Sequence, residues 1–145
     1  MRIASRAPKK ERKMDHRTIL VVDDEPAITA SLAYCLEQEG YRVVVASNGE
    51  EAVRLVMHEV PDLIVSDIMM PRVDGYELCR RIRTYYKTNT IPFLFLTAKT
   101  AAESKLKGMR LGSDDYITKP FDLSELLLKV RRILDRKPTL SDPAR

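Results

Sequence analysis

The stretch TILVVDD at residues 18–24 decides the fold of this chain. Its short, β-branched and uninterrupted apolar run is typical of a strand that is buried on both faces, as strands of parallel sheets are. Three later stretches have the same form: LIVSD at 63–67, IPFLFLT at 91–97 and YITKP at 116–120. The carboxyl ends of the strands line the ligand crevice of an open parallel sheet. We therefore expect one cleft to hold the polar residues at these ends, which are Asp23, Asp24, Asp67, Thr97 and Lys119.

These side chains offer carboxylates, a hydroxyl and an ammonium group. Carboxylates that share a crevice repel one another unless a cation lies among them. Hard cations such as Mg²⁺ bind carboxylate oxygens, and a lysine ammonium binds phosphate oxygens as a compact charge. The residue types together therefore suit a divalent cation and a phosphoryl group. Each residue alone is a weaker indication, because an Asp after a strand is usually a turn or cap residue.

Length and composition indicate one small domain. A chain of 145 residues can bury an adequate core, and its 44% hydrophobic and 32% charged content is ordinary for a globular protein. Cys35 and Cys79 lack the spacing of metal ligands, which favours thiols in a reducing compartment. No apolar run reaches the roughly 18 residues that span a bilayer, and the N-terminus lacks the apolar core of a signal peptide. We therefore expect a cytoplasmic location and no membrane partner.

The net charge of +4 arises from the N-terminal tail. Residues 1–17 hold seven basic and two acidic side chains and no aromatic residue. A basic arm can bind nucleic acid, but this composition is more typical of a solvated, disordered extension. We expect a basic tail at 1–17, a globular domain at 18–137, and a tail or linker stub at 138–145. Direct binding of nucleic acid by the domain is not expected.

Strand and helix patterns alternate five times after the tail. This alternation predicts right-handed βαβ units and an α/β three-layer sandwich with a parallel sheet. The pattern alone does not settle the strand order, for which the flavodoxin-like order 2-1-3-4-5 is one of two common choices. The predicted strands are 18–22, 41–46, 63–66, 91–96 and 115–118, and the predicted helices are 26–38, 49–59, 76–85, 101–109 and 122–136.

Residues at the predicted helix starts agree with these bounds. Pro26 falls in a first turn, where its missing N–H costs nothing. Asn48, or Ser47 before it, is a candidate N-cap for the second helix. Asp122 with Glu125 three residues later resembles a capping box for the last helix.

The sequence closely resembles a response regulator receiver domain, the phosphoacceptor half of a two-component system. The resemblance covers about residues 18–137 and implies a flavodoxin-like (βα)5 fold with sheet order 2-1-3-4-5. Its separations fit as well, with 43 residues from Asp24 to Asp67, 30 from Asp67 to Thr97 and 22 from Thr97 to Lys119. Each motif alone is common, but the set in this order, each at a strand end, is specific. The matching residues are Asp23, Asp24, Asp67, Pro71, Asp74, Gly75, Thr97, Ala98, Lys119, Pro120 and Phe121.

The resemblance implies that Asp67 is the phosphoacceptor. A sensor histidine kinase or a histidine phosphotransfer protein would supply the phosphoryl group, and Asp67 would carry it as an acyl phosphate. Mg²⁺, for which Mn²⁺ can substitute, would offset the repulsion between nucleophile and donor. Asp24, Asp67 and the Met69 backbone carbonyl would be direct ligands, with Asp23 acting through a metal-bound water. Beyond this self-catalysed phosphotransfer and dephosphorylation, no enzymatic activity is expected.

The resemblance gives the remaining roles to Lys119, Thr97 and Tyr116. The Lys119 ammonium would bridge a carboxylate oxygen and a phosphoryl oxygen, with a cis Lys119–Pro120 bond aiming it into the cleft. The Thr97 hydroxyl would move toward the phosphoryl group, and Tyr116 would turn inward to fill the vacated space. Such a two-state packing change would carry the signal to the surface.

The last third of the chain resembles the winged-helix transcription-factor subclass of regulators, which dimerise through the fourth helix, fifth strand and fifth helix. We expect phosphorylation to switch this surface and control output, with a homodimer as one result. Arg110 departs from the pattern, since an acidic residue is usual there. The charged positions that match by spacing are Lys105 with Glu125, Asp115 with Lys129, and Asp114 with Arg136.

Three alternatives to a stand-alone regulator remain open. The chain could be the receiver of a longer DNA-binding regulator, of which residues 138–145 would be a linker. A haloacid-type phosphohydrolase also uses an aspartyl nucleophile, but it places a second carboxylate two residues later, where this sequence has Met69. A degenerate receiver acting as a constitutive binding module would not need the intact set of five residues.

Overall fold

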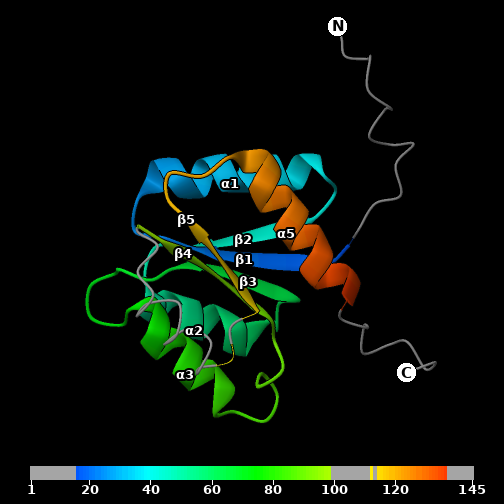
Figure 1. Cartoon of the computed structure of the whole chain (residues 1–145). Helices are drawn as coiled ribbons and strands as arrows, with labels where there is room; N and C mark the ends of the chain where they lie inside the picture. The colour runs from blue at the N-terminus through cyan, green and yellow to red at the C-terminus, as the bar shows by residue number, and fades with distance from the viewer. Residues whose placement is uncertain (1–15, 99–111, 113, 137–145) are drawn as a thin grey trace, which may run out of the picture.

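The computed structural model describes residues 16–98, 112 and 114–136, in which four helices enclose a parallel sheet of five strands (Figure 1). The sheet order β2-β1-β3-β4-β5 confirms the expected flavodoxin-like topology. The strands are β1 Thr18–Val22, β2 Arg42–Ala46, β3 Leu63–Asp67, β4 Phe93–Thr97 and β5 Asp115–Thr118. The helices are α1 Pro26–Gln38, α2 Gly49–His58, α3 Gly75–Arg83 and α5 Leu123–Arg136.

The expected helix at 101–109, with Lys105, lies outside the described residues, as do most of the two tails. Within the described residues the predicted elements are present, and their bounds shift by at most two residues at each end. The largest consequence is at the strand ends, because Asp67 and Thr97 are the last residues of β3 and β4 rather than the first residues of loops. No helix among the described residues is both long and apolar enough to cross a membrane.

Side chains of β1 alternate between two hydrophobic cores. Ile19 and Val21 pack in the core covered by α1 and α5, whereas Leu20 and Val22 pack in the core covered by α2 and α3 (Figure 1). All four side chains are at most 1% exposed. The central strand has no polar face because helices cover both sides of it, which explains its uninterrupted apolar sequence.

Strand register brings the strand ends into line. Val22 pairs with Ser66 across β1 and β3, so Asp23 and Asp67 follow at the same edge. Across β3 and β4, Asp67 pairs with Leu96, which places Thr97 one residue beyond. The carboxyl ends of β1, β3 and β4, where the crevice was expected, therefore lie in line with one another.

Helices α2 and α3 each begin with a side-chain N-cap. Asn48 Oδ1 accepts a hydrogen bond from the backbone N–H of Glu51 at 2.8 Å, as expected for an N-cap. Asp74 caps α3 in the same way through Glu77, also at 2.8 Å. These caps end the loops that lead from β2 and β3 and hold the loops near the crevice.

Asp122, before α5, accepts hydrogen bonds from a residue nearer in sequence than the partner that the capping box predicted. Its Oδ1 accepts hydrogen bonds from the backbone N–H of Ser124 at 3.0 Å and from the Ser124 hydroxyl at 2.9 Å. The expected partner was Glu125, one residue later. The Ser124 hydroxyl explains the difference, because it adds a second donor to the same carboxylate oxygen.

Candidate active site

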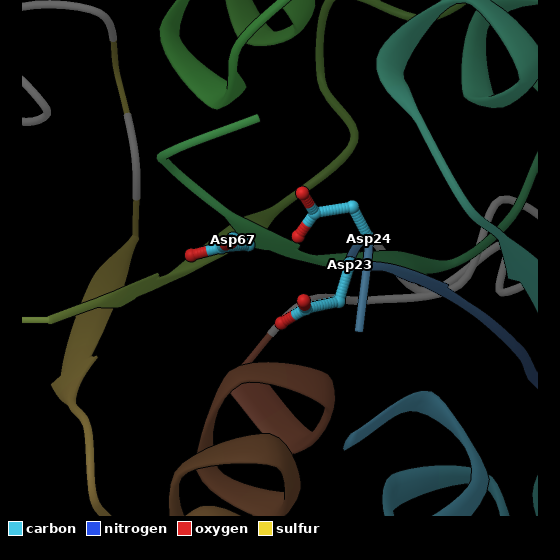
Figure 2. Close-up of side chains that lie close together, drawn as sticks. All are labelled: Asp23, Asp24 and Asp67. Carbon is cyan, nitrogen blue, oxygen red and sulfur yellow. The ribbon is translucent and has the colours of Figure 1, made fainter. Parts of the chain in front are cut away.

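Three carboxylates lie together at the carboxyl edge of the sheet. Asp23 and Asp24 follow β1, and Asp67 ends the neighbouring strand β3. One oxygen from each of the three lies within 4.8 Å of the other two, and Figure 2 shows the three side chains close together. Asp23 is 1% exposed and Asp67 5% exposed, whereas Asp24 is open to solvent. This cluster could hold a metal ion, as the sequence predicted.

Lys119 supplies the positive charge of the site. It follows β5, and its backbone N–H donates to the Thr97 carbonyl at 2.6 Å, which anchors the loop to the end of β4. Its Nζ lies 3.0 Å from Asp23 Oδ2, 3.3 Å from Asp67 Oδ1 and 3.5 Å from Glu25 Oε1. The Lys119–Pro120 peptide bond is cis. The structure therefore joins Lys119 to two of the clustered carboxylates and to a third, Glu25, that sequence reasoning missed.

The electrostatics of the site follow from burial and crowding. Burial and the charge of Asp23 raise the pKa of Asp67, although Lys119 acts in the opposite direction. Burial lowers the pKa of Lys119, but its hydrogen bond to Asp23 and the charge of Asp67 outweigh that effect and leave the pKa raised. Lys119 is therefore a cation at neutral pH, and one cation does not balance the carboxylates around it. The excess of buried negative charge fits a divalent cation.

Thr97 lies beside Asp67 at the end of the next strand. Thr97 is 7% exposed and is the last residue of β4. The residue before it, Leu96, pairs with Asp67. Tyr116 lies on the neighbouring strand β5, in register with Phe95, and packs half-buried against the core covered by α2 and α3. The two residues that the sequence links in a switch are therefore on adjacent strands.

Two glycines hold the loop that follows Asp67. A Cβ on Gly75 would lie 2.4 Å from the Asp67 carbonyl oxygen and 2.8 Å from the Ile68 Cα, both backbone atoms. The Gly75 backbone N–H also donates to the Ile68 carbonyl at 2.8 Å. A Cβ on Gly49 would lie 2.5 Å from the carbonyl oxygen of Val73, in the same loop. From the sequence, Gly75 was identified only among the residues that match the receiver family, and the fold is what brings it against the backbone of Asp67.

Residues of the expected dimer face have contacts within the chain. Lys129 Nζ lies 3.0 Å from Asp115 Oδ2 and 5.9 Å from the centre of the Tyr116 ring. Asp114 Oδ2 accepts a hydrogen bond from the Phe93 backbone N–H at 3.0 Å, which ties β5 to the start of β4. The face also includes Glu125 and Arg136 on α5, while Lys105 is outside the described residues.

Met69, whose backbone carbonyl is the expected metal ligand, follows β3 and is 71% exposed.

A family model and two curated relatives agree on the family that this chain resembles. A family model for the response regulator receiver domain matches residues 19–131. The chain is 47% identical over 121 residues to the alkaline phosphatase synthesis transcriptional regulatory protein PhoP of Bacillus subtilis, covering 83% of this chain and 50% of that protein. It is 42% identical over 127 residues to the DNA-binding dual master transcriptional regulator RpaA of a Synechocystis species, covering 88% and 53%. The chain thus spans about half the length of the curated relatives it matches.

Solved structures agree with the sequence comparison. The non-phosphorylated HemR receiver domain from Leptospira biflexa superposes with a TM-score of 0.78 at 36% identity, covering 85% of this chain and 98% of that one. The chemotaxis protein CheY4 of Vibrio cholerae superposes with a TM-score of 0.79 at 32% identity, covering 83% and 100%. Both the fold and the sequence therefore point to the same family.

Replacing Gly75 by Ala should displace the cluster, because the new methyl group meets backbone atoms that cannot move aside alone. We expect a loss of stability of about 1–3 kcal/mol, the usual cost of overpacking, and a weaker affinity for Mg²⁺. Urea unfolding and calorimetric metal titration would measure the two effects. Gly40→Ala, which places a side chain at a φ of 98° at the far end of α1, should lower stability without changing metal affinity. Unchanged metal affinity in Gly75→Ala would contradict the positioning role.

Replacing Asp67 by Asn should stabilise the metal-free protein at neutral pH. The pKa of Asp67 is raised in the folded state, so its ionised form opposes folding at pH values above that pKa. The amide removes this opposition, and we expect a melting temperature higher by roughly a few degrees in chelator at pH 7. The difference should shrink as pH falls from the raised folded-state pKa toward the unfolded value of about 3.9, and it should vanish below that value, where both states are protonated. Asp135→Asn, at an exposed carboxylate, is the control; a lower melting temperature for Asp67→Asn would contradict the prediction.

Proposed function

The chain belongs to the response regulator receiver domain family, and we propose that it accepts a phosphoryl group on Asp67 in a Mg²⁺-dependent reaction. The donor would be a sensor histidine kinase or a histidine phosphotransfer protein. One observation carries the proposal: Lys119 Nζ lies 3.3 Å from Asp67 Oδ1, in a cluster where three carboxylates approach within 4.8 Å. That arrangement provides a nucleophile, a cation for phosphoryl oxygens and oxygen ligands for a metal ion.

The metal would be held by Asp24 and Asp67 directly, with the Met69 carbonyl as a third ligand and Asp23 acting through water. The fit rests on hard oxygen donors and on the negative charge that Lys119 leaves unbalanced. Asp23 is the less suited to direct ligation, because its Oδ2 already binds Lys119 and its Oδ1 accepts the Glu25 backbone N–H at 3.0 Å. When bound, Mg²⁺ would offset negative charge on the phosphoryl oxygens.

Phosphotransfer would form a bond between a carboxylate oxygen of Asp67 and phosphorus. The bond from phosphorus to the donor's imidazole nitrogen breaks, and its electron pair stays on that nitrogen. Lys119 would pair with a phosphoryl oxygen while it stays near Asp67, which lowers the repulsion between two anions. The buried position of Asp67 limits access of water to the resulting acyl phosphate.

The switch would begin at Thr97. Its hydroxyl would donate to a phosphoryl oxygen, and Tyr116 on the adjacent strand would turn into the space that Thr97 leaves. Tyr116 lies under the Lys129 ammonium, and Lys129 pairs with Asp115. A rotation of the ring would therefore alter this ion pair at the surface of β5 and α5.

The altered surface would control output. We propose that phosphorylation favours a homodimer through this face, in which Asp115 and Lys129 exchange their pairing within the chain for contacts across the interface. The Asp114 carboxylate could pair with Arg136 of a second copy while its Oδ2 still accepts from the Phe93 N–H, because a carboxylate has acceptor sites for several donors. The other matched pair is Lys105 with Glu125.

A second reading is a receiver within a longer DNA-binding regulator. It is favoured by the two curated relatives, which are named as transcriptional regulators and of which the chain covers about half. In that case the phosphorylated face would bring together two DNA-binding domains outside residues 18–137. The native open reading frame decides between this reading and a stand-alone regulator.

Asp67 should be the sole stable phosphorylation site. Incubation with acetyl phosphate and Mg²⁺ should add one phosphoryl group to the wild-type protein, measured by intact mass. Asp67→Asn should abolish this gain, because an amide oxygen is a poor nucleophile, whereas Asp135→Asn should label normally. Strong labelling of Asp67→Asn would contradict the assignment, and rapid turnover of donor without a stable adduct would indicate a phosphohydrolase.

Mg²⁺ affinity should depend on Asp24 more than on Asp23. Loss of a direct ligand removes a metal–oxygen bond, whereas loss of a water-mediated contact typically weakens binding by about 10- to 100-fold. We therefore expect calorimetric titration to give weaker binding for Asp24→Asn than for Asp23→Asn. Thermal melts of both variants would verify that each is folded. An equal or reversed order of affinities would refute the ligand assignment.

A further inference from the structure

Glu25 contacts the site lysine without belonging to the carboxylate cluster. Its Oε1 lies 3.5 Å from Lys119 Nζ, next to the contacts of that ammonium with Asp23 at 3.0 Å and Asp67 at 3.3 Å. Three carboxylates therefore surround this ammonium. The Lys119 side chain is only 17% exposed, which gives it little freedom to leave the site. A phosphoryl group on Asp67 would have to compete with these contacts.

The backbone of Glu25 is fixed from both sides. Its N–H donates to Asp23 Oδ1 at 3.0 Å, and its carbonyl accepts from the N–H groups of Ile28 and Thr29 at 3.0 and 3.2 Å. Glu25 is the N-cap residue of α1, yet its side chain forms no capping hydrogen bond. A short polar residue usually caps at this position. The long side chain of Glu25 instead extends to Lys119, and the fixed backbone holds it there.

We propose that Glu25 is a positioning residue that holds Lys119 in the unphosphorylated state and thereby slows capture of the phosphoryl group. The inference rests on the proposed function of Asp67. Lys119 must turn part of its donor capacity to the phosphoryl oxygens. Of the three carboxylates that pair with it among the described residues, Glu25 is the one it can release most easily. The Glu25 side chain is 62% exposed, whereas the Asp23 and Asp67 side chains are 0% and 7% exposed. Exposed ion pairs are weak because water competes for both charges.

The direct test is the rate of phosphorylation of the full chain by acetyl phosphate at saturating Mg²⁺. Glu25→Gln keeps the length of the side chain and removes its charge, so Lys119 is held less tightly. We expect the initial rate to rise about two- to five-fold, the scale of a weak exposed ion pair. The rate of loss of the phosphoryl group and the affinity for Mg²⁺ should stay within error of the wild-type values, because neither step requires Glu25 to hold Lys119.

A second variant separates contact with Lys119 from net charge. Glu25→Asp keeps the negative charge but shortens the side chain by one carbon–carbon bond, about 1.5 Å, so the carboxylate no longer reaches Nζ. A positioning role predicts that Glu25→Asp accelerates phosphorylation as Glu25→Gln does. If Glu25→Asp behaves as the wild type, Glu25 acts only by repelling the anionic donor, and the positioning role is wrong.

The matched control is Glu59→Gln. Glu59 is also an exposed glutamate in an ion pair, with Arg42 at 3.0 Å, and it lies at the C-terminal end of α2, away from the site. Its substitution removes the same charge and should leave the rate unchanged. An unchanged or slower rate for Glu25→Gln, with normal labelling of the wild-type protein, overturns the inference alone. Failure of the wild-type protein to label at all overturns the proposed function and the inference with it.

Discussion

The burial of Asp67 beside Asp23 is the constraint on which the site depends. Two nearly inaccessible carboxylates within 4.8 Å of one another are unfavourable, and the raised pKa of Asp67 reflects that cost. Lys119 offsets part of the charge by lying within 3.3 Å of both. The remaining negative charge is what makes the crevice suitable for a divalent cation. The same crowding makes the site responsive, since a metal ion or a phosphoryl group changes the balance of charge around a single ammonium.

The parallel sheet is what produces this crowding. Its strands run in one direction, so their carboxyl ends meet at one edge, and the polar residues at the ends of β1, β3 and β4 lie near one another there. Helices on both faces bury β1, β3 and β4 completely, which fixes the register and leaves the ends of these strands little room to move. Gly75 adds to this rigidity, because its missing side chain lets the β3–α3 loop fold against the Asp67 backbone. Asp67, the proposed nucleophile, therefore lies at the end of a strand rather than on a loop.

The path from the site to the surface is short. Thr97 and Tyr116 lie on adjacent strands, and Lys129 lies over the Tyr116 ring while it pairs with Asp115. A change at the phosphoryl site would therefore reach a charged surface through one packed side chain. At the other end of the site, Asp23 connects Glu25 to Lys119, because one carboxylate oxygen accepts from the Glu25 backbone and the other from the lysine. The unphosphorylated and phosphorylated states would differ in which oxygen atoms contact the Lys119 ammonium.

The strands, the helices and the residue types gathered at the site could be predicted from the sequence. Uninterrupted apolar runs predict strands wherever both faces are covered, and the polar residues that end them identify Asp23, Asp24, Asp67, Thr97 and Lys119, because these patterns depend on neighbours along the chain. Three features could be found only in the folded chain: the contact of Glu25 with Lys119, the approach of Gly75 to Asp67, and the pairing of Lys129 with Asp115 within one chain rather than across a dimer. The reason is physical: Lys119 lies 94 residues from Glu25 along the chain, and a contact over that separation depends on strand order and register, which no local pattern encodes.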